Sequence, residues 1–332
     1  MTTYLQSLQQ ALDTAMTDDP TVYILGEDIL DPYGGAFKVT KGLSTKFSDR
    51  VITTPISEAG FIGVANGMAL RGLKPVAEIM FGDFITLTAD QMINYAAKFA
   101  AMYHKTMPGA VVLRVPMGAG RGYGPTHSQS LEKIFMGVPG MKIIAPSHFH
   151  NPGELLKNVI LYEREPVLFL EHKLLYPKSL ISAETHPNWI ITSTRERYPT
   201  VTIKNSTQKP DVTLIAYGGA AMWLEPLLDR MTEEEIYIQI CLPSSVQPVE
   251  LDSLSACCAQ SDHVILVEES TSEFNWSAEI AAQLQSRLWG TLKSPIHRIA
   301  SKNSVIPAAK PLEEHYLPST EKIENAIFEV LL

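Results

Sequence analysis

The stretch TPISEAGFIGVANGMAL, residues 54–70, joins a short polar entry to a long apolar helix pattern. Glu58 stands at the point where a predicted strand ends and this helix begins. Gly60, Gly63 and Gly67 recur at helical spacing, which leaves a bare stripe on which a flat ring or another helix could lie close to the backbone. A strand that leads directly into such a helix is typical of α/β folds.

Glu58 is the one carboxylate in these apolar surroundings. Burial removes a carboxylate from water and raises its pKa, so Glu58 would be suited to sharing a proton with a ring nitrogen of a bound ligand. Ser57 and Glu58 could instead simply cap the helix, because the positive end of the helix dipole favours a negative charge there. Both interpretations remain open at this stage.

Length and composition indicate an ordinary globular protein of two domains. The chain has 332 residues, and domains average about 100 to 200 residues. Hydrophobic residues make up 45% and charged residues 19% of the chain, with no apolar run of transmembrane length. Residues 1–20 resemble an amphipathic helix rather than a signal peptide, so we expect a cytoplasmic protein without a membrane partner.

Charge and cysteine content exclude other classes. The net charge is −9 and no cluster of basic residues is present, which argues against a nucleic-acid partner. Cys241, Cys257 and Cys258 lack metal-ligand spacing with histidine, so we expect all three to be reduced and structural.

Apolar runs of strand length alternate with helical patterns through the first half of the chain, which predicts a parallel α/β sheet over residues 1–180. Residues 181–209 are rich in Ser, Thr and Pro and are predicted to form a linker. A second, smaller α/β domain is predicted over residues 210–332. The predicted strands cover residues 21–28, 50–55, 74–80, 109–116, 141–147, 166–172, 211–219, 236–243, 263–270 and 295–300.

Candidate site residues follow two of the predicted strands. Glu27 opens a glycine-rich loop, residues 26–43, at the carboxyl end of a strand, where open α/β sheets bind ligands. It could instead be simply solvated. Met80 and Phe84 follow the next strand but one, where they could stack on a ring or fill the core beneath a helix.

His127 lies in the polar loop RGYGPTHSQS, residues 121–130. A loop histidine can act as a general acid or base, although most such residues are ordinary surface residues. The chain has no P-loop, no H-E-x-x-H and no Gly-Asp-Gly followed by paired asparagines, the pattern that would bind a magnesium diphosphate. We therefore predict no metal site in this chain.

Taken in order, these motifs resemble the β subunit of the thiamine diphosphate-dependent first component of 2-oxo acid dehydrogenase complexes, of the pyruvate and branched-chain types. The resemblance is dense over residues 1–177 and looser beyond. It implies a pyrimidine-binding domain of the transketolase type, followed by a transketolase C-terminal-like domain. It also implies an α2β2 heterotetramer in which the α subunit grips the cofactor's diphosphate through magnesium.

The resemblance gives each candidate an expected role. Glu58 matches the glutamate that bonds a ring nitrogen of the cofactor's aminopyrimidine, and Phe84, with Met80 beside it, matches the aromatic that packs on that ring. His127 matches a histidine near the substrate channel that helps to pass the acyl group to a lipoyl group. Glu27 matches an acidic residue in the polar tunnel between the two cofactors.

Departures from the family pattern leave several alternatives open. Asn151 and Pro152 stand where an aspartate is common near a potassium-binding loop, so a structural potassium ion is not expected. The sequence also departs from the family pattern at residues 270–272 and 303–311, in the domain that the resemblance associates with assembly. These changes leave it open whether the chain associates with a lipoyl acyltransferase core or with a carrier protein. The alternatives are a related two-subunit thiamine enzyme, of the acetoin dehydrogenase or biosynthetic acyl-transfer type, and a non-catalytic scaffold paralogue. The sequence does not identify the 2-oxo acid.

Overall fold

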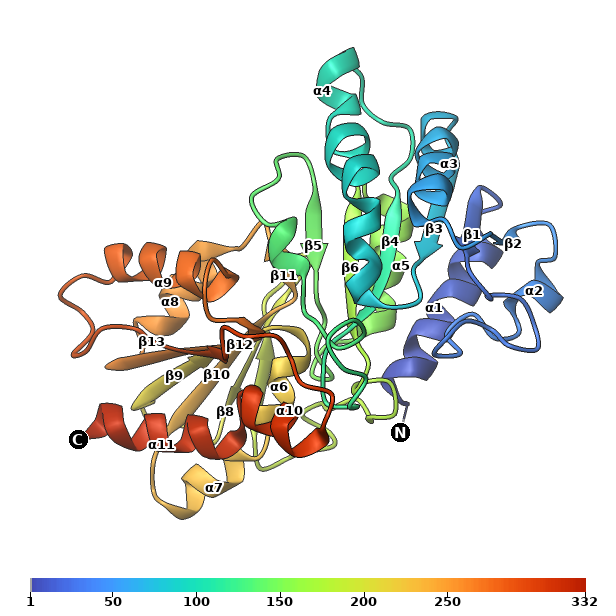
Figure 1. Cartoon of the computed structure of the whole chain (residues 1–332). Helices are drawn as coiled ribbons and strands as arrows, with labels where there is room; N and C mark the ends of the chain where they lie inside the picture. Colours follow the sequence, from blue (N-terminus) through green and yellow to red (C-terminus); the bar gives the residue numbers. More distant parts are fainter. Residues whose placement is uncertain (1) are drawn as a thin grey trace. The chain divides into compact units, whose positions relative to one another are not determined.

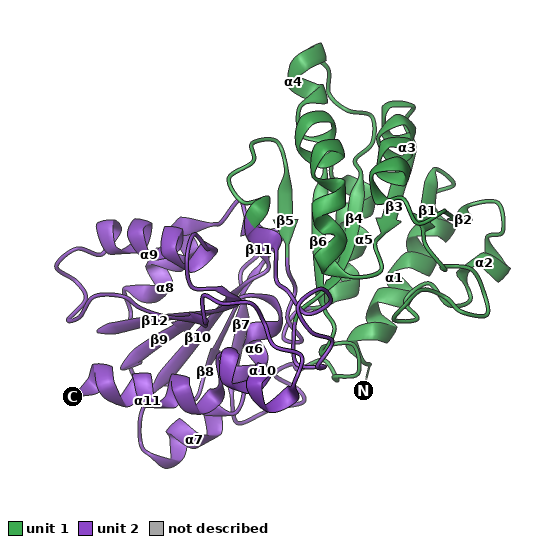
Figure 2. Cartoon of the chain, in the orientation of Figure 1, with its two compact units in different colours: residues 1–118, 134–144, 151–180 green, residues 119–133, 145–150, 181–332 purple. Residues whose placement is uncertain are grey.

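The computed structural model describes residues 2–332, which form two compact units (Figures 1 and 2). Unit 1 takes in the chain up to Gly118, together with residues 134–144 and 151–180. Unit 2 contains residues 119–133, 145–150 and 181–332. Each unit is built on a β-sheet with helices, which confirms the predicted α/β class. Within residues 2–332, no helix is both long enough and apolar enough to span a bilayer.

The strands of unit 1 lie in the order β5-β6-β4-β3-β1-β2 and all of these neighbours are parallel. All six strands predicted for this part of the chain are present. The apolar runs of all of them except the edge strand β2 are buried, as expected for a parallel sheet covered by helices. The strands are β1 (Val22–Gly26), β2 (Val51–Thr53), β3 (Lys74–Glu78), β4 (Val112–Met117), β5 (Lys142–Ile144) and β6 (Val167–His172).

The structure confirms helices at the N-terminus, after Glu58 and after Asn151, differs from the pattern over residues 90–104, and adds two short helical elements, α2 and η1, that the pattern does not predict. The pattern predicts a single helix over residues 90–104, whereas the structure has a π-helix followed by a short α-helix. Gly140 approaches this junction so closely that a Cβ on it would lie 2.4 Å from the Ala97 carbonyl oxygen. The helical elements are α1 (Tyr4–Asp18), α2 (Leu43–Lys46), α3 (Glu58–Leu70), η1 (Gly82–Thr88), η2 (Gln91–Ala96), α4 (Phe99–Tyr103) and α5 (Pro152–Tyr162).

The register of the sheet brings three strand ends to one level. Gly26, the last residue of β1, pairs with Thr53 on β2 and with Glu78 on β3. The segments that follow these strands therefore leave the sheet at the same edge. This edge carries Glu27, the residues that lead to Glu58, and the start of the Met80 segment, so the fold places most of the candidate site at the carboxyl ends of parallel strands.

A buried ion cluster joins three strands of the same sheet. Arg114 on β4 and Glu171 on β6 are fully buried, and Glu78 on β3 is 3% exposed. The Arg114 guanidinium donates two hydrogen bonds to Glu171, at 2.7 and 2.6 Å, and a third to Glu78. The Tyr176 hydroxyl also donates to Glu171, at 2.8 Å. Every strand in this group is therefore tied by charge as well as by its backbone ladder.

The strands of unit 2 lie in the order β13-β12-β9-β10-β8-β7, in which β8 is antiparallel to both of its neighbours. In Figure 1, α8 and α9 lie on one side of this sheet and α7 and α11 on the other. Strands β7 and β8 fall within residues 181–209, the interval predicted as a linker. The strands of this sheet are β7 (Ile190–Ser193), β8 (Thr200–Lys204), β9 (Val212–Ile215), β10 (Ile238–Pro243), β12 (His263–Thr271) and β13 (His297–Ser301). The short strand β11 (Ser245–Gln247) also belongs to unit 2 but is not part of this sheet.

The helices of unit 2 cover a continuous core that includes residues from β9, β10, β12 and α11. The helix pattern predicted over residues 220–231 divides at Pro226, because proline has no backbone N–H to donate within a helix. The helical elements are η4 (Gly218–Ala220), α6 (Ala221–Leu224), α7 (Leu227–Glu233), α8 (Leu251–Cys258), α9 (Trp276–Arg287), α10 (Lys310–Tyr316) and α11 (Thr320–Leu331), with the short turn η3 (Glu132–Ile134) earlier in the chain.

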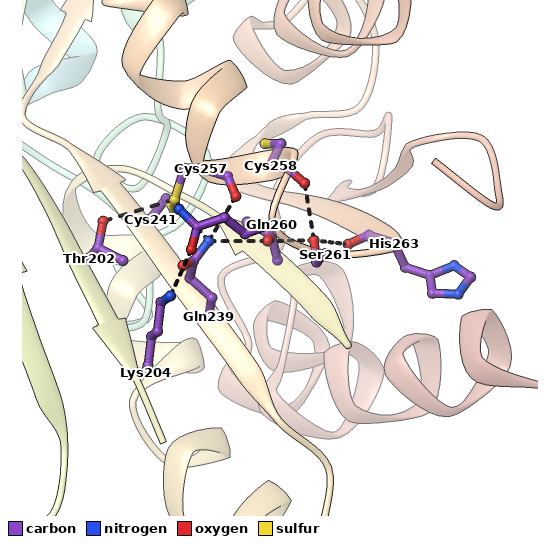
Figure 3. Close-up of a disulfide and its surroundings, with 10 residues drawn as sticks. Thr202, Lys204, Gln239, Cys241, Cys257, Cys258, Gln260, Ser261 and His263 are labelled. Atoms are coloured by element: carbon purple, nitrogen blue, oxygen red, sulfur yellow. Dashed lines mark hydrogen bonds between the residues drawn. A yellow bond between two sulfur atoms is a disulfide. The ribbon is translucent and has the colours of Figure 1, made fainter. Parts of the chain in front are cut away.

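A disulfide links β10 to α8 in unit 2 (Figure 3). The structure pairs Cys241 with Cys257 as a disulfide, which differs from the expectation that all three cysteines are reduced. Gln239 donates from its side-chain amide to the Cys257 carbonyl at 3.0 Å. Cys258 stays a free thiol, and burial raises its pKa to about 12, which keeps it unreactive.

A buried histidine organises the segment that the family resemblance associates with potassium. The His150 Nδ1 accepts a hydrogen bond from the Ser147 N–H at 3.0 Å, and its Nε2 lies 3.1 Å from the Leu242 carbonyl oxygen. This pattern fits a neutral ring protonated at Nε2. Burial lowers the pKa of His150 to about 4.

Replacing Arg114 with Met should be strongly destabilising. Glu78 and Glu171 would stay buried without their cation, which costs on the order of 3–5 kcal/mol in the free energy of unfolding. Arg114→Lys keeps the positive charge but cannot form the bidentate hydrogen bonds. Its free energy of unfolding should therefore lie between those of the wild type and the Arg114→Met variant. Urea denaturation followed by circular dichroism measures both.

The matched control is Lys46→Met, which removes an exposed ion pair with Asp13 in the same unit. It should cost less than about 1 kcal/mol. Equal losses for the Arg114 and Lys46 variants would contradict a structural role for the buried cluster.

His150 should make the protein sensitive to acid. Its pKa falls from 6.5 in the unfolded chain to about 4 in the native one. As the pH falls through this interval the unfolded state binds a proton and the native state does not, so native stability declines, by up to about 3 kcal/mol. His150→Gln should flatten this part of the stability profile, measured as urea midpoints from pH 7 to pH 4. An unchanged slope would mean that other groups cause it.

Candidate functional site

Two buried carboxyl groups meet at the carboxyl edge of the unit 1 sheet. Glu27, which follows β1, is 3% exposed and Glu58, the first residue of α3, is 5% exposed. The backbone N–H of Ser57 donates to the Glu27 carboxylate. Burial raises the pKa of Glu27 to about 7, and the negative charges of Glu58 and then Asp28 contribute to the same shift. The structure therefore brings these two predicted residues together.

Polar atoms beside this pair have no partner among the described residues. The Glu27 Oε1 and the Thr54 Oγ1 are both buried without a hydrogen bond. Thr54 is held in place because its N–H donates to the Gly26 carbonyl oxygen at 3.0 Å. Buried polar atoms without partners are uncommon in native proteins, so these two mark a place where a ligand could supply the missing bonds.

The capping alternative for residues 57 and 58 is only partly realised. Ser57 is the N-cap residue of α3, but its side chain makes no capping hydrogen bond. Glu58 lies in the first helical turn, where the helix dipole favours its negative charge. A capping role for Ser57 therefore does not explain this junction, and Glu58 remains available for another task.

Met80 and Phe84 are both half-buried. The Phe84 ring meets the edge of Phe81 with centroids 6.2 Å apart, and Phe81 in turn meets Phe37 at 5.5 Å. The buried ammonium group of Lys173 lies 5.3 Å from the centroid of the Phe81 ring. Phe84 is thus fixed by an aromatic cluster while part of its surface stays accessible, which suits a ring-stacking position.

His127 belongs to unit 2, whereas the other four candidates belong to unit 1. Its imidazole is half-buried and its Nδ1 lies 3.0 Å from the Thr126 Oγ1. The preceding loop is anchored by buried Glu313, whose carboxylate accepts from the N–H groups of Gly120 and Gly122 at 3.0 and 2.9 Å. The loop that carries His127 is therefore tied to α10.

Sequence analysis missed the charged residues inside the strands. Glu78, Arg114 and Glu171 each interrupt an otherwise apolar run, and a charge in a buried strand needs a partner. That signal was visible in the sequence, although the pairing was not. Gly35 shows that the glycine-rich loop lies over this cluster, because a Cβ on it would stand 2.6 Å from the Glu78 Oε1. The positive φ of Gly35, +82°, also favours glycine.

The outer face of α3 is apolar and exposed. Val64 is 57% exposed and Leu70 is 42% exposed. The glycine stripe divides: a Cβ on Gly63 would meet the Gln91 side chain at 3.2 Å, whereas one on Gly67 would meet nothing within 4 Å. A helix that is apolar all round is normally buried, so this face has the character of an interface.

Protein-family models match both halves of the chain. Residues 1–179 match the transketolase pyrimidine binding domain, and residues 202–323 match the transketolase C-terminal domain. Among solved structures, a split-gene transketolase described as an inactive β4 tetramer has the same fold, with a TM-score of 0.73 at 19% identity over 98% of this chain and 97% of that one.

Comparison with individual proteins narrows the family further than the domain models do. A β subunit of acetoin:2,6-dichlorophenolindophenol oxidoreductase from Cupriavidus necator is 32% identical over 96% of this chain and 94% of its own length. The pyruvate dehydrogenase E1 component subunit β-1 of Arabidopsis thaliana is 34% identical, covering 98% and 88%. The 2-oxoisovalerate dehydrogenase β subunit of Bacillus subtilis is 31% identical, covering 98% of both chains.

These matches run over almost the whole chain and agree with the two-unit fold and with the sequence motifs around Glu58. This chain therefore belongs to the family of β subunits of the thiamine diphosphate-dependent first component of 2-oxo acid dehydrogenases.

Proposed function

We propose that this chain is a catalytic β subunit that holds the aminopyrimidine ring of thiamine diphosphate against Glu58. The observation that carries this proposal is the buried pair of Glu27 and Glu58, with an unpartnered carboxyl oxygen on Glu27. A chain with no use for a ligand at this edge would gain stability by replacing such groups with apolar ones.

The residues present fit the cofactor's ring. Glu58 supplies a carboxylate for a ring nitrogen, Thr54 supplies a buried hydroxyl without a partner, and Phe84 with Met80 supplies a partly exposed apolar surface for stacking. When bound, thiamine diphosphate supplies the carbon nucleophile that allows a 2-oxo acid to lose carbon dioxide.

Glu58 and Glu27 have different tasks in this proposal. Glu58 holds a proton between its carboxylate and the ring nitrogen. Glu27, with its pKa at about 7, takes up or releases a proton near neutral pH. Because the charge of Glu58 contributes to that pKa, a proton that moves onto Glu58 makes Glu27 more acidic, and the two groups exchange protons in opposite directions.

The proposed partner is an α subunit in an α2β2 heterotetramer, which binds the diphosphate through magnesium. Two features support this partner: the exposed apolar face of α3 at Val64 and Leu70, and the lack of a Gly-Asp-Gly pattern with paired asparagines in this chain. The open space above Gly67 would let a partner backbone approach closely.

The proposed acceptor of the acyl group is a lipoyl group, with His127 assisting the transfer from its anchored loop. The lipoyl group would be carried by an acyltransferase core or a carrier protein, in the cytoplasm. Relatives named for pyruvate, 2-oxoisovalerate and acetoin enzymes are 31–34% identical to this chain, so an acetoin-type or biosynthetic acyl-transfer enzyme is the alternative within the same chemistry. A panel of 2-oxo acids and acetoin distinguishes them.

Glu58→Gln should abolish most of the 2-oxo acid decarboxylation by this chain reconstituted with its α subunit, thiamine diphosphate and magnesium. The reason is that an amide can neither give a proton to the ring nitrogen nor take it back. The assay measures carbon dioxide release with a dye as the electron acceptor. A rate within about threefold of the wild type, under about 1 kcal/mol, would show that Glu58 has no such role.

Glu154→Gln is the matched control, because Glu154 is exposed on α5 and its replacement should leave the rate unchanged. Calorimetry of thiamine diphosphate uptake by the same reconstituted pair separates a catalytic subunit from a scaffold paralogue. Absence of uptake would favour the scaffold.

Glu58→Gln should also lower the pKa of Glu27 from about 7, because it removes the largest of the charges that raise it. Asp28→Asn removes a smaller contribution and should shift the titration less; Asn tolerates the positive φ of 52° at that position. Carboxyl-carbon NMR of the chain labelled at glutamate follows the midpoint without any activity assay. A midpoint that stays in place or rises in the Glu58 variant would refute the coupling.

A further inference from the structure

Glu78 lies directly beside the segment that carries Glu27. It is the last residue of β3, and it pairs in the sheet with Gly26, the residue that precedes Glu27. A Cβ on Gly26 would stand 2.7 Å from the Glu78 carbonyl oxygen and 3.3 Å from the Glu78 Cβ. No side chain fits at that distance without a shift of the backbone, so the chain passes Glu78 this closely because residue 26 is glycine.

The chain meets Glu78 a second time beyond Glu27. A Cβ on Gly35 would stand 2.6 Å from the Glu78 Oε1, and the φ of Gly35, +82°, is one that side chains rarely adopt. Gly35 is also tied to the start of its loop, because its N–H donates to the Asp28 carbonyl oxygen at 3.0 Å. Glu27 is therefore flanked in the chain by two glycines that both lie against Glu78.

The loop between these two glycines is closed on itself. Thr40 is fully buried, and its hydroxyl donates to the Ile29 carbonyl oxygen at 3.1 Å. A Cβ on Gly35 would also meet the Thr40 Oγ1 at 3.2 Å, so Gly35 is enclosed from a second side. Because hydrogen bonds join the ends of the loop, a displacement at Gly35 would be passed to Asp28 and from there to Glu27.

The Glu78 side chain is held in place from the opposite side. Arg114 donates to the Glu78 Oε2, and Glu171 fixes Arg114 through two hydrogen bonds of 2.7 and 2.6 Å. The other carboxylate oxygen of Glu78, Oε1, is the one that lies against Gly35. The ion cluster therefore presents a fixed surface to the glycine-rich loop.

The chemistry of Glu27 depends on how well this loop covers it. Glu27 is 3% exposed, and burial is the largest cause of its raised pKa. The charges that act on it are those of Glu58, on α3, and Asp28, on its own loop, and both are negative. A loop that moved off the sheet would admit water to Glu27 and return its pKa toward the ordinary value.

We propose that Glu78 is a positioning residue for Glu27: its side chain, fixed by Arg114, supports the backbone on both sides of Glu27 and keeps that carboxyl group buried beside Glu58. The ion cluster thus has a second task besides joining strands. The importance of this support for catalysis rests on the proposed function, whereas the support itself rests on the close approaches at Gly26 and Gly35.

Gly35→Ala in the full chain tests the support by carboxyl-carbon NMR, with Glu27→Gln to identify the signal. The added methyl group collides with the Glu78 Oε1 and lifts the loop, so the titration midpoint of Glu27 should fall from about 7 by about one pH unit or more. Gly42→Ala is the comparison, because Gly42 also has a positive φ, +91°, but a Cβ there meets nothing within 4 Å. It should leave the midpoint unchanged, and circular dichroism checks that both variants are folded.

Glu78→Asp supplies an independent arm. It keeps the charge for Arg114 but withdraws the carboxyl group from Gly35, so it should also lower the Glu27 midpoint. In the double variant the shorter side chain leaves room for the methyl group, and the combined shift should be smaller than the sum of the single shifts.

An unmoved midpoint in Gly35→Ala, equal shifts in the two glycine variants, or additive shifts in the double variant would overturn the proposal. If Gly35→Ala does not fold, Glu78→Asp alone decides, and an unmoved midpoint in that variant has the same consequence. The titration needs no α subunit, cofactor or substrate, so its failure is distinguishable from failure of the decarboxylation assay.

Discussion

The fold of unit 1 depends on the pairing of Arg114 with Glu78 and Glu171. These charges sit inside a parallel sheet, where neither water nor an exposed surface can solvate them. Their hydrogen bonds span β3, β4 and β6 and so fix how neighbouring strands are aligned. The strand ends that carry the candidate cofactor site are held by the same alignment, because β1 pairs in register with β3, and β2 pairs in turn with β1. A buried ion cluster contributes specificity here rather than a large net gain in stability.

The candidate site is a different use of buried carboxyl groups. Within the ion cluster every carboxylate has a cation, whereas the charges that act on Glu27 from the described residues are those of Glu58 and Asp28, both negative. The result is a proton-binding group with a pKa near neutrality, which is what general acid and base chemistry requires. In unit 1, Glu78 and Glu171 are therefore neutralised by Arg114 and serve the structure, whereas Glu27 can gain or lose a proton near neutral pH.

Unit 2 shows a related contrast between satisfied and unsatisfied groups. Glu313 is fully buried yet accepts two backbone hydrogen bonds and anchors the loop of His127. Ser128 and Ser270 are also buried, but the hydroxyl of each has no partner among the described residues. The same unit therefore contains both satisfied and unsatisfied buried polar groups.

The sequence by itself determined ten of the strands, the start of α3 at Glu58, and the family, because these depend on periodicity and on short motifs whose residues are adjacent in the chain. It did not reveal β7 and β8, which lie in the interval predicted as a linker. The charges at Glu78, Arg114 and Glu171 interrupt apolar runs in the sequence, but they were not among the residues predicted from it. Only the tertiary structure decided that these three form one cluster, that a raised pKa falls on Glu27, that Cys241 bonds Cys257, and that the loop after Glu27 lies against Glu78. Each of those features joins residues far apart in sequence, and burial, charge coupling and bonding between them depend on distances that the order of residues does not contain.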